Sequence, residues 1–252
     1  MKKLWKNTIF LSAAGIAFLI LVWVIAYFAV GNQYVLPSPW ETVGKAGELL
    51  GRKAFYVAFL GTLGRACLAF LIAFVLGVGF ALIAYLYPTF EKTLRGIVAI
   101  LRSLPTVAVL LLILLGVSYA FAPVMIGILT LFPLLYTASI AALSSVDRDL
   151  IELSNVYRVP LMERVKKLYL PCALPALLCE SVAALSFSLK LTVSAEVLAF
   201  TYQSLGGLIQ EANLAAEAET ALLLTLIVCA VGIVLESVGL FLLRRWEERR
   251  CA

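Results

Sequence analysis

The stretch TIFLSAAGIAFLILVWVIAYFAV, residues 8–30, decides the fold class of this chain. It contains no charged residue, and as a helix it is long enough to cross the roughly 30 Å hydrocarbon core of a bilayer. The basic start, MKKLWK, is similar to that of a signal peptide, but the apolar stretch is longer than a signal sequence and no clear A-x-A site follows it. We therefore predict a retained membrane helix, ended by the Pro-rich segment VLPSPW at 35–40.

Further apolar stretches predict five more membrane helices, at 66–86, 106–121, 123–143, 174–200 and 221–243. A very short turn around Ala122 is expected to join the third and fourth spans, and the fifth span is longer than a bilayer requires. Helices satisfy their own backbone hydrogen bonds in lipid, and the period-2 alternation of a barrel is absent. We expect an all-α, polytopic membrane protein of about six helices, one domain over 1–252 with its core at 66–243.

The composition supports this class and excludes several kinds of enzyme. Hydrophobic residues make up 63% of the chain and charged residues 14%, whereas a soluble domain has roughly 25% charged residues. The chain has no histidine, which excludes Ser-His-Asp triads and zinc sites built on imidazole. Its five cysteines show no zinc spacing, and Cys172 and Cys179 would lie too far apart on a helix for a disulfide. We interpret them as small apolar side chains and predict no metal site.

The basic residues are unevenly divided between the two sides of the predicted bundle. Fifteen of the 20 fall on the side that carries both termini, the second–third connection and the fourth–fifth connection, and three fall on the other side. Within the second–third connection this count includes Lys92, Arg95 and Arg102. The positive-inside rule then predicts that both termini are cytoplasmic.

The longest cytoplasmic connection, 144–170, has the pattern of two short helices. Apolar residues recur at helical spacing between 150 and 157, after two aspartates that favour a helix N-terminus. Pro160 interrupts this helix, and a second helix over 161–169 is expected to end at Leu170-Pro171. The pattern leaves two interpretations open, an interfacial helix on lipid headgroups or a docking element for a cytoplasmic partner.

This connection resembles the EAA loop of permease subunits of bacterial binding-protein-dependent ABC importers, in which E-A-A is followed by three residues, G, nine residues, I, one residue and L-P. The spacing is intact, and the aligned positions are Glu152, Leu153, Ser154, Arg158, Leu168, Leu170 and Pro171. The Ala, Ala and Gly of the motif are replaced. Because Gly permits a left-handed turn, Arg158 together with Pro160 predicts a changed turn geometry.

Further motifs resemble the subfamily of these permeases that imports sulfonates, taurine, nitrate and thiamine precursors. In chain order they are LPSP at 36–39, TLGR at 62–65 for S-L-x-R, LRSLP at 101–105 for R-S-x-P, LKLTVSAE at 189–196 for W-K-x-x-V-A-A-E without the Trp, and QSLGGL at 203–208 for S-x-G-x-x-L. Each motif is weak alone, but their order and their positions relative to the spans make the set specific.

The resemblance implies a permease of the bacterial inner membrane that imports a small polar or anionic solute. Its expected partners are two copies of an ATP-binding subunit, a second permease copy, most simply as a homodimer, an extracellular solute-binding protein and the lipid bilayer, with no nucleic acid. The chain has no G-x-x-x-x-G-K-[ST], so ATP is expected on the partner, and no catalytic residue or cofactor is expected here. The coupling residues implied by the resemblance are Glu152, Leu153, Ser154, Arg158, Pro160, Leu168 and Pro171.

Four charged residues fall within predicted spans, namely Glu180, Lys190, Glu196 and Glu236. A charge at a helix centre costs roughly 2.5–3.5 kcal/mol on insertion scales, so these side chains should face the bundle interior, a water path or the interface. Lys190, the deepest, either lines the path near an anionic solute or pairs with a glutamate of another helix. Glu196 is assigned to the path or to the interface, and Arg65 is expected to snorkel outward.

Ser103 and Pro105 open the predicted third span. A proline at a helix start is ordinary, and the functional alternative is a gate at the cytoplasmic side of the path. Gly64, Gly77 and Gly79 are interpreted as sites of close helix packing. Two other functions compete with the permease: a secondary transporter would show internal repeats, and an intramembrane enzyme would need a cluster of catalytic polar residues. We find neither feature in the sequence.

Overall fold

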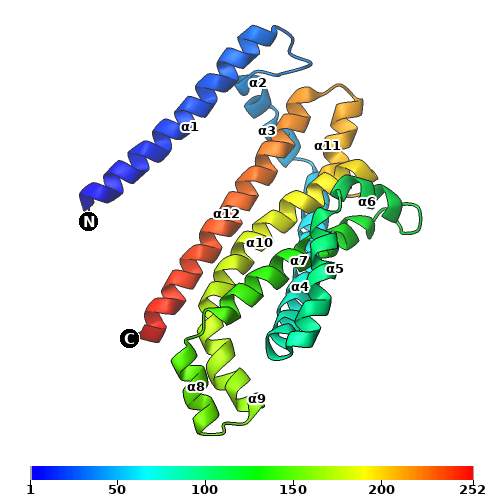
Figure 1. Ribbon diagram of the computed structural model, residues 1–252. Helices are drawn as coiled ribbons and strands as arrows, with labels where there is room; N and C mark the ends of the chain where they lie inside the picture. The colour runs from blue at the N-terminus through cyan, green and yellow to red at the C-terminus, as the bar shows by residue number, and fades with distance from the viewer. Residues whose placement is uncertain (1, 252) are drawn as a thin grey trace.

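The structure is a computed structural model that describes the backbone of residues 2–251 and the side chains of that range except 2–13, 247 and 249–251. All elements of the described range are helical (Figure 1). They are α1 (Lys2–Val30), α2 (Pro39–Gly44), α3 (Ala46–Leu50), α4 (Lys53–Leu86), α5 (Pro88–Ser103), α6 (Thr106–Ile113), α7 (Ala122–Ser144), α8 (Arg148–Val156), α9 (Leu161–Arg164), a π-helical turn (Val165–Tyr169), α10 (Leu170–Ala199), α11 (Leu205–Leu214) and α12 (Ala218–Cys251).

Within the part of the chain that the structure describes, four helices are long and apolar enough to cross a membrane. They are α4, α7, a continuous helix over Leu161–Ala199 that includes α10, and Ala218–Trp246 of α12. Helices α5 and α6 meet the same criterion only together, as a pair bent by 92°. The part of α1 whose side chains are described, Ala14–Val30, is an apolar helix shorter than these spans. The prediction of an all-α, polytopic membrane protein is confirmed, and the count of six spans stays a prediction.

The prediction of one helix over 106–121 is wrong. Helix α6 ends at Ile113, and turns follow, with the Leu115 N–H donating to Leu112 O at 3.2 Å. Gly116 and the residues after it favour turns over a helix interior, and Ala122 begins α7 instead of forming a short turn. On the other side, Pro105 places Leu104 in an extended conformation and separates α6 from α5.

A stripe of small residues along α4 holds the centre of the bundle together. At every third or fourth position it buries Ala58, Thr62, Ala66, Ala69, Ala73, Gly77, Ala81 and Ala84. Small side chains let neighbouring helices approach closely, and α7 and α10 pack along this stripe. A Cβ on Gly77 would lie 2.9 Å from Leu135 Cβ, which agrees with the packing prediction for this glycine. Gly64 and Gly79 have no neighbour within 4 Å of such a Cβ, so neither makes a close helix contact within this chain.

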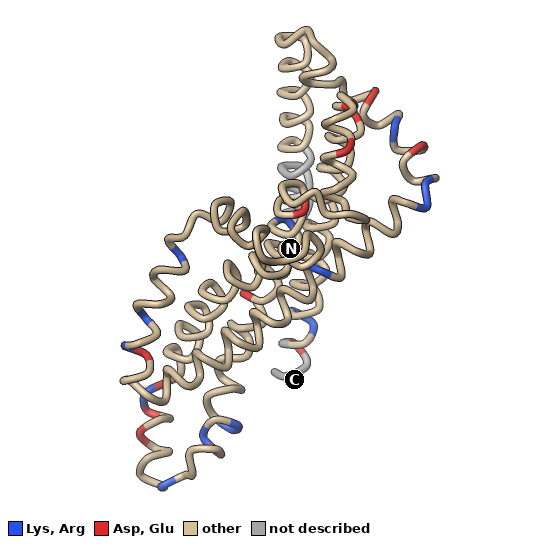
Figure 2. Tube along the Cα trace, turned by 90° about the vertical axis from the view of Figure 1, so that its right-hand side faces the viewer, with Lys and Arg blue, Asp and Glu red and all other residues tan. Residues whose placement is uncertain are grey.

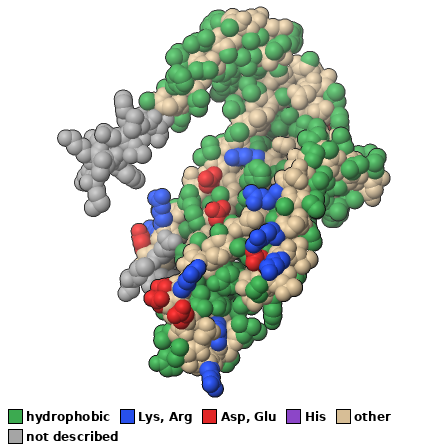
Figure 3. All heavy atoms as spheres, in the orientation of Figure 1, with side chains coloured by type: hydrophobic (Ala, Val, Ile, Leu, Met, Phe, Trp, Pro, Cys, Tyr) green, Lys and Arg blue, Asp and Glu red, His purple; other side chains and the backbone are tan. Residues whose placement is uncertain are grey.

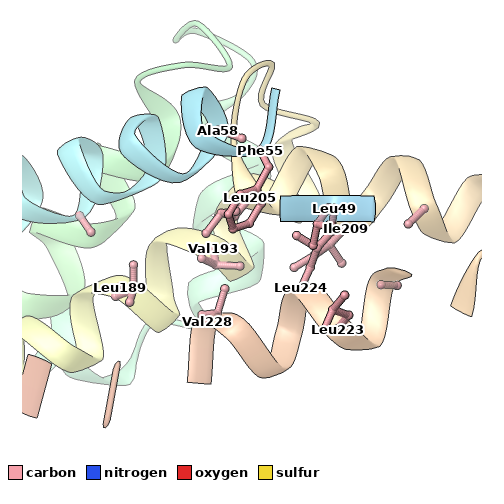
Figure 4. Packing of buried hydrophobic residues seen from close by; sticks show 13 residues of the cluster. Leu49, Phe55, Ala58, Leu189, Val193, Leu205, Ile209, Leu223, Leu224 and Val228 are labelled. Carbon is pink, nitrogen blue, oxygen red and sulfur yellow. The ribbon is translucent and has the colours of Figure 1, made fainter. Parts of the chain in front are cut away.

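A second cluster of buried residues joins α3, α4, α10, α11 and α12 (Figure 4). Leu189 and Val193 of α10 meet Leu224 and Val228 of α12, and Leu205 contributes from the start of α11. Figure 4 shows these side chains converging between the helices. The short helix α11 is therefore fixed against the ends of two long helices.

The elements gather at two ends of the molecule (Figure 1). Helices α2, α3 and α11 lie at the upper end, while the α4–α5 turn, the α8–α9 hairpin and the end of α12 lie at the lower end. Helix α1 stands apart from the bundle and is joined to it near α2. There the Trp23 Nε1–H donates to Pro37 O at 3.1 Å, and the ring of Tyr27 meets Trp40 edge to face.

Candidate functional site

The hairpin of α8 and α9 is the first candidate site. Asp147 caps α8 by accepting a hydrogen bond from the Asp149 N–H at 3.0 Å, in line with the acidic start of the sequence pattern. The helix ends in a Schellman motif, in which the Arg158 N–H donates to Asn155 O and the Val159 N–H donates to Ser154 O, both at 3.0 Å. The two helices predicted around Pro160 are thus present, joined by a defined turn.

Arg158 occupies the left-handed position of this motif, with φ of 50°. The prediction that its turn geometry changes is wrong, because Arg158 adopts the conformation that a glycine would supply. A left-handed conformation costs a non-glycine residue roughly 1–2 kcal/mol. Arg164 of the second helix stabilises the turn, since its Nε donates to Val159 O at 2.7 Å and its Nη1 donates to Asn155 Oδ1.

The second helix of the hairpin does not end at Leu170-Pro171, and that prediction is wrong. From α9 it continues through the π-helical turn Val165–Tyr169 into α10, and the Leu170 N–H donates to Val165 O. A wide π turn accommodates the missing N–H and the ring of Pro171, which would otherwise break a helix. The hairpin and a membrane helix therefore form one continuous helical body over Leu161–Ala199.

The hairpin exposes apolar side chains instead of burying them. Val156 is 77% exposed, Tyr157 75% and Met162 64%. A groove of about 330 Å³ between the two helices is lined by Leu150, Leu153, Ser154, Tyr157, Val159, Glu163, Arg164, Lys167 and Leu168. Of the predicted coupling residues, the structure brings together Leu153, Ser154 and Leu168 in this groove. Glu152, Arg158 and Pro160 are exposed outside its lining, and Pro171 is half-buried in the first turn of α10.

A buried ion pair between α4 and α10 is the second candidate site. Glu196 has no exposed surface, and its carboxylate accepts a hydrogen bond from Arg65 Nε at 2.7 Å. Thr62 Oγ1 donates to the other carboxylate oxygen at 2.8 Å, and the Gly206 N–H donates to the same oxygen at 3.3 Å. The interface interpretation of Glu196 is wrong, and so is outward snorkelling of Arg65, because each side chain turns inward to the other.

Helix α11 is held by the same network. The Leu205 N–H donates to Thr62 Oγ1 at 2.8 Å, and Arg65 Nη2 donates to Gln203 O at 3.2 Å. The N-terminus of α11 thus points toward the carboxylate of Glu196, and the helix dipole favours a negative charge at that end. Three motifs noted in the sequence, at 62–65, 189–196 and 203–208, therefore meet at one place.

The backbone at this network is tightly constrained. Phe200 and Gln203 both have φ of 51°, in the left-handed region, and Thr201 Oγ1 donates to Tyr119 O at 2.9 Å. A Cβ on Gly206 would lie 2.7 Å from Val193 O, so α11 packs here backbone against backbone. The geometry gives Glu196 the role of fixing α11, and it lines no path in this conformation. No group of three His, Cys, Asp or Glu side chains within the described range could hold a metal ion.

The other predicted intramembrane charges are exposed. Glu180, Lys190 and Glu236 all lie on the surface of this single chain, and none of them forms an ion pair with another described side chain. Lys190 belongs to a stripe along α10 whose members are exposed and recur every three or four positions: Cys172, Ala176, Cys179, Ala183, Phe187, Lys190, Ser194 and Leu198. One face of a membrane helix is therefore left uncovered from end to end.

The break between α5 and α6 borders this face. Ser103 and Pro105 are both exposed there, and Ser103 Oγ donates to Ile100 O at 2.8 Å. A pocket of about 190 Å³ at the break is lined by Leu101, Arg102, Leu104, Thr106, Val109, Ile126, Leu129, Thr130, Pro133, Leu134 and Phe187. Since Pro133 is halfway along α7, the break lies at mid-helix depth, and the prediction that it lies at the cytoplasmic end of a span is wrong.

Arg102 occupies a place that charge counting does not predict. The count assigns it to a cytoplasmic connection, but it lies near the end of α5, beside the middle of α7. A signal is present in the sequence, because Phe90, Leu94, Val98 and Leu101 recur at helical spacing through this connection. The structure buries Leu94 and Val98 of this series in the core.

Comparison with known proteins gives a family and a fold. Residues 69–250 match the family described as binding-protein-dependent transport system inner membrane component. The chain is similar to a chain of the inward-facing MetNI methionine ABC transporter at 18% identity and a TM-score of 0.67, covering 75% of this chain and 94% of that chain. It is also similar to a bacterial ABC transporter involved in the import of the acidic polysaccharide alginate, at 19% identity and 0.66, covering 96% and 99%. No curated protein matches the chain significantly.

Proposed function

Since the chain belongs to the family of binding-protein-dependent transport system inner membrane components, and is therefore a multi-pass permease subunit of an ABC importer, we propose that it forms the path for a small polar or anionic solute. An extracellular binding protein delivers the solute, and two copies of a separate subunit bind and hydrolyse ATP. A second copy of this chain completes the path. Family membership favours this importer over the secondary transporter considered from the sequence.

The exposed apolar hairpin is the observation that carries the coupling part of this proposal. Val156, Tyr157 and Met162 are each more than half exposed, although burying apolar surface is favourable by about 25 cal/mol per Å². A groove of the ATP-binding subunit would cover them, with Glu152, Leu153, Ser154, Arg158, Pro160, Leu168 and Pro171 as the coupling residues. Because the hairpin is continuous with α10, a displacement of the hairpin moves a membrane helix as one body.

The translocation path is proposed along the uncovered face of α10 and the neighbouring α5–α6 break. Lys190 lies on the exposed stripe of α10, and Ser103 and Pro105 lie at the break. Phe187 of the stripe and Leu104 of the break line one pocket, which supports a shared surface. Glu196, predicted for the path, acts instead by positioning α11.

Orientation and subfamily are also part of the proposal. The excess of basic residues on one side supports cytoplasmic termini, and the α8–α9 hairpin lies at the same end of the molecule as the end of α12 (Figure 1). The sulfonate, taurine, nitrate and thiamine-precursor subfamily is supported by five motifs, three of which contribute residues to the Arg65–Glu196 network.

Co-purification with the ATP-binding subunit tests the proposal. We expect Tyr157→Asp to reduce recovery of that subunit at least about ten-fold, which corresponds to roughly 1.4 kcal/mol of binding free energy. Tyr34→Asp is the matched control, because Tyr34 is 70% exposed, close to the 75% of Tyr157, and belongs to the α1–α2 connection, at the opposite end of the molecule from the hairpin (Figure 1). Equal recovery with both variants would contradict the docking assignment and favour the lipid-surface interpretation. Solute uptake by the chain alone, driven by an ion gradient, would contradict the importer.

A further inference from the structure

Helix α5 carries basic residues into the depth of the bundle. Leu94 and Val98 pack with residues of α4 and α7, including Ala81 and Tyr136, so α5 runs along two membrane helices. From Pro88 to Arg102 it rises 14 positions, about 21 Å. Figure 2 shows Lys and Arg at successive heights along this helix, not gathered at one end. Arg102 thus lies level with the middle of α7, where a bilayer-facing helix would carry apolar residues.

The basic side chains of α5 are only partly neutralised by acidic side chains. Arg95 pairs with Glu91 at 2.7 Å, while Arg102 is exposed and makes no ion pair with any other side chain in the described part of the chain. Arg95 and Arg102 line a pocket of about 260 Å³ with Tyr136 and Thr137 of α7. Charged side chains at this depth face water or a partner and are seldom exposed to lipid.

Lys190 lies on the exposed stripe of α10, at the edge next to α12, because a Cβ on Gly232 of α12 would lie 3.5 Å from Lys190 Cε. Arg102 lines a pocket with Phe187, three positions before Lys190 on the exposed stripe. Figure 3 shows basic side chains down the middle of one face of the molecule, with acidic side chains beside the upper ones. Glu180, the acid beside the α10 stripe, lies 10 positions from Lys190 toward the hairpin, about 15 Å away along the helix. Glu236 lies on α12 four positions after Gly232, so an acidic residue is present on the helix that the Lys190 side chain approaches.

We propose that Arg102 makes this face the wall of a water-filled, electropositive cavity within the membrane, which admits anions in preference to cations. This inference rests on the proposed path along the same face and adds Arg102 as a residue that determines its charge selectivity. Thr130 of α7 supplies a hydroxyl group to the pocket that Arg102 lines, whereas the hydroxyl of Thr137 donates to the Pro133 and Leu134 carbonyl oxygens of its own helix.

Cysteine modification tests the cavity without knowledge of the solute. In the full chain with its five native cysteines replaced, Ala99→Cys places a thiol in the pocket beside Arg102. Ile100→Cys places one about 100° further round α5, on an exposed apolar surface that includes Ile97. Membrane fragments that are open to the reagent on both sides are treated with two methanethiosulfonates. One carries an anionic sulfonate group and the other a cationic trimethylammonium group. In both cases the thiolate forms a mixed disulfide and methanesulfinate leaves.

We expect the thiol at position 99 to react with both reagents, faster with the sulfonate, and the thiol at position 100 to react slowly with both. Arg102→Gln should lower the ratio of the two rates at position 99 on the order of ten-fold, because it removes a unit charge one helical turn away, and Arg102→Lys should restore it. Equal slowness at both positions would overturn the cavity. A ratio near one, or a ratio unchanged by Arg102→Gln, would overturn its electropositive character. Because the assay uses neither ATP nor the partner subunits, its failure is distinguishable from failure of the importer proposal.

Discussion

Replacing Arg65 by methionine is expected to destabilise the protein strongly. Glu196 has no exposed surface, and in this variant its carboxylate would keep only the neutral donors Thr62 Oγ1 and the Gly206 N–H. Removing one partner of a buried ion pair typically costs about 3–5 kcal/mol, because the remaining charge stays desolvated. At roughly 2–4 °C per kcal/mol for a chain of this size, the midpoint of thermal unfolding should fall by about 10 °C.

A double-mutant cycle separates the pair from the rest of the network. We expect Glu196→Gln alone to cost less than Arg65→Met, because the amide retains hydrogen bonding and the Arg65 side chain, 18% exposed, keeps access to water. The double variant Arg65→Met with Glu196→Gln should be more stable than the sum of the single losses, with a coupling free energy of about 1–3 kcal/mol. Thermal unfolding of purified protein in detergent measures all four states of the cycle.

The matched control is Arg52→Met. Arg52 also pairs with a glutamate, but its side chain is 62% exposed and its distance to Glu48 is 3.7 Å, so the variant should leave unfolding unchanged within about 1 kcal/mol. The reasoning would be refuted by an Arg65→Met variant that unfolds at the same temperature as this control. It would also be refuted by strictly additive losses in the cycle, because additivity means that the two charges do not interact.

Two further predictions concern backbone geometry. Arg158→Gly should raise the resistance of the hairpin to proteolysis, because it relieves a left-handed backbone conformation that costs roughly 1 kcal/mol, and faster cleavage would contradict this. Gly206→Ala should destabilise the chain by about 1–3 kcal/mol, the usual cost of an overpacked core, because its Cβ would lie 2.7 Å from Val193 O. Gly64→Ala, with no neighbour within 4 Å, should unfold like the unmodified chain, and a similar loss in both variants would refute the packing argument.

The fold class could be predicted from the sequence because lipid imposes a simple rule. A long uncharged helix crosses a bilayer with all its backbone hydrogen bonds satisfied, so α7, α10 and α12 could be located by apolar length alone. The same rule failed at α5, where polar residues on one side reduced the apolar length below the threshold. Pairing α5 with the apolar α6 across the Pro105 break required knowledge of the 92° bend, which depends on packing against α7.

Charge counting failed at α5 for a related reason. The positive-inside rule assumes that a basic residue outside an apolar stretch lies in a loop. Arg102 violates that assumption because it lies on a helix whose other side is apolar and buried. The orientation derived from the count does not change when Arg102 is removed from it, since the remaining asymmetry is still large. The position of Arg102 beside the middle of α7, however, could be found only from the packing of α5 against its neighbouring helices.

The Arg65–Glu196 pair shows that the side of a helix on which a charged residue lies predicts whether that residue pairs within the chain, which its charge and its depth in the span do not. Both residues lie near the outer ends of their predicted spans and carry opposite charges, but Lys190 and Glu236 also carry opposite charges and do not pair in the described chain. Phase distinguishes Glu196 from Lys190. Along α10, Glu196 falls in line with buried Leu189, Thr192 and Val193, whereas Lys190 falls in line with exposed residues of the uncovered stripe. A charge in phase with the buried series must find its partner within the chain, and a charge in phase with the exposed series must face water or a second molecule.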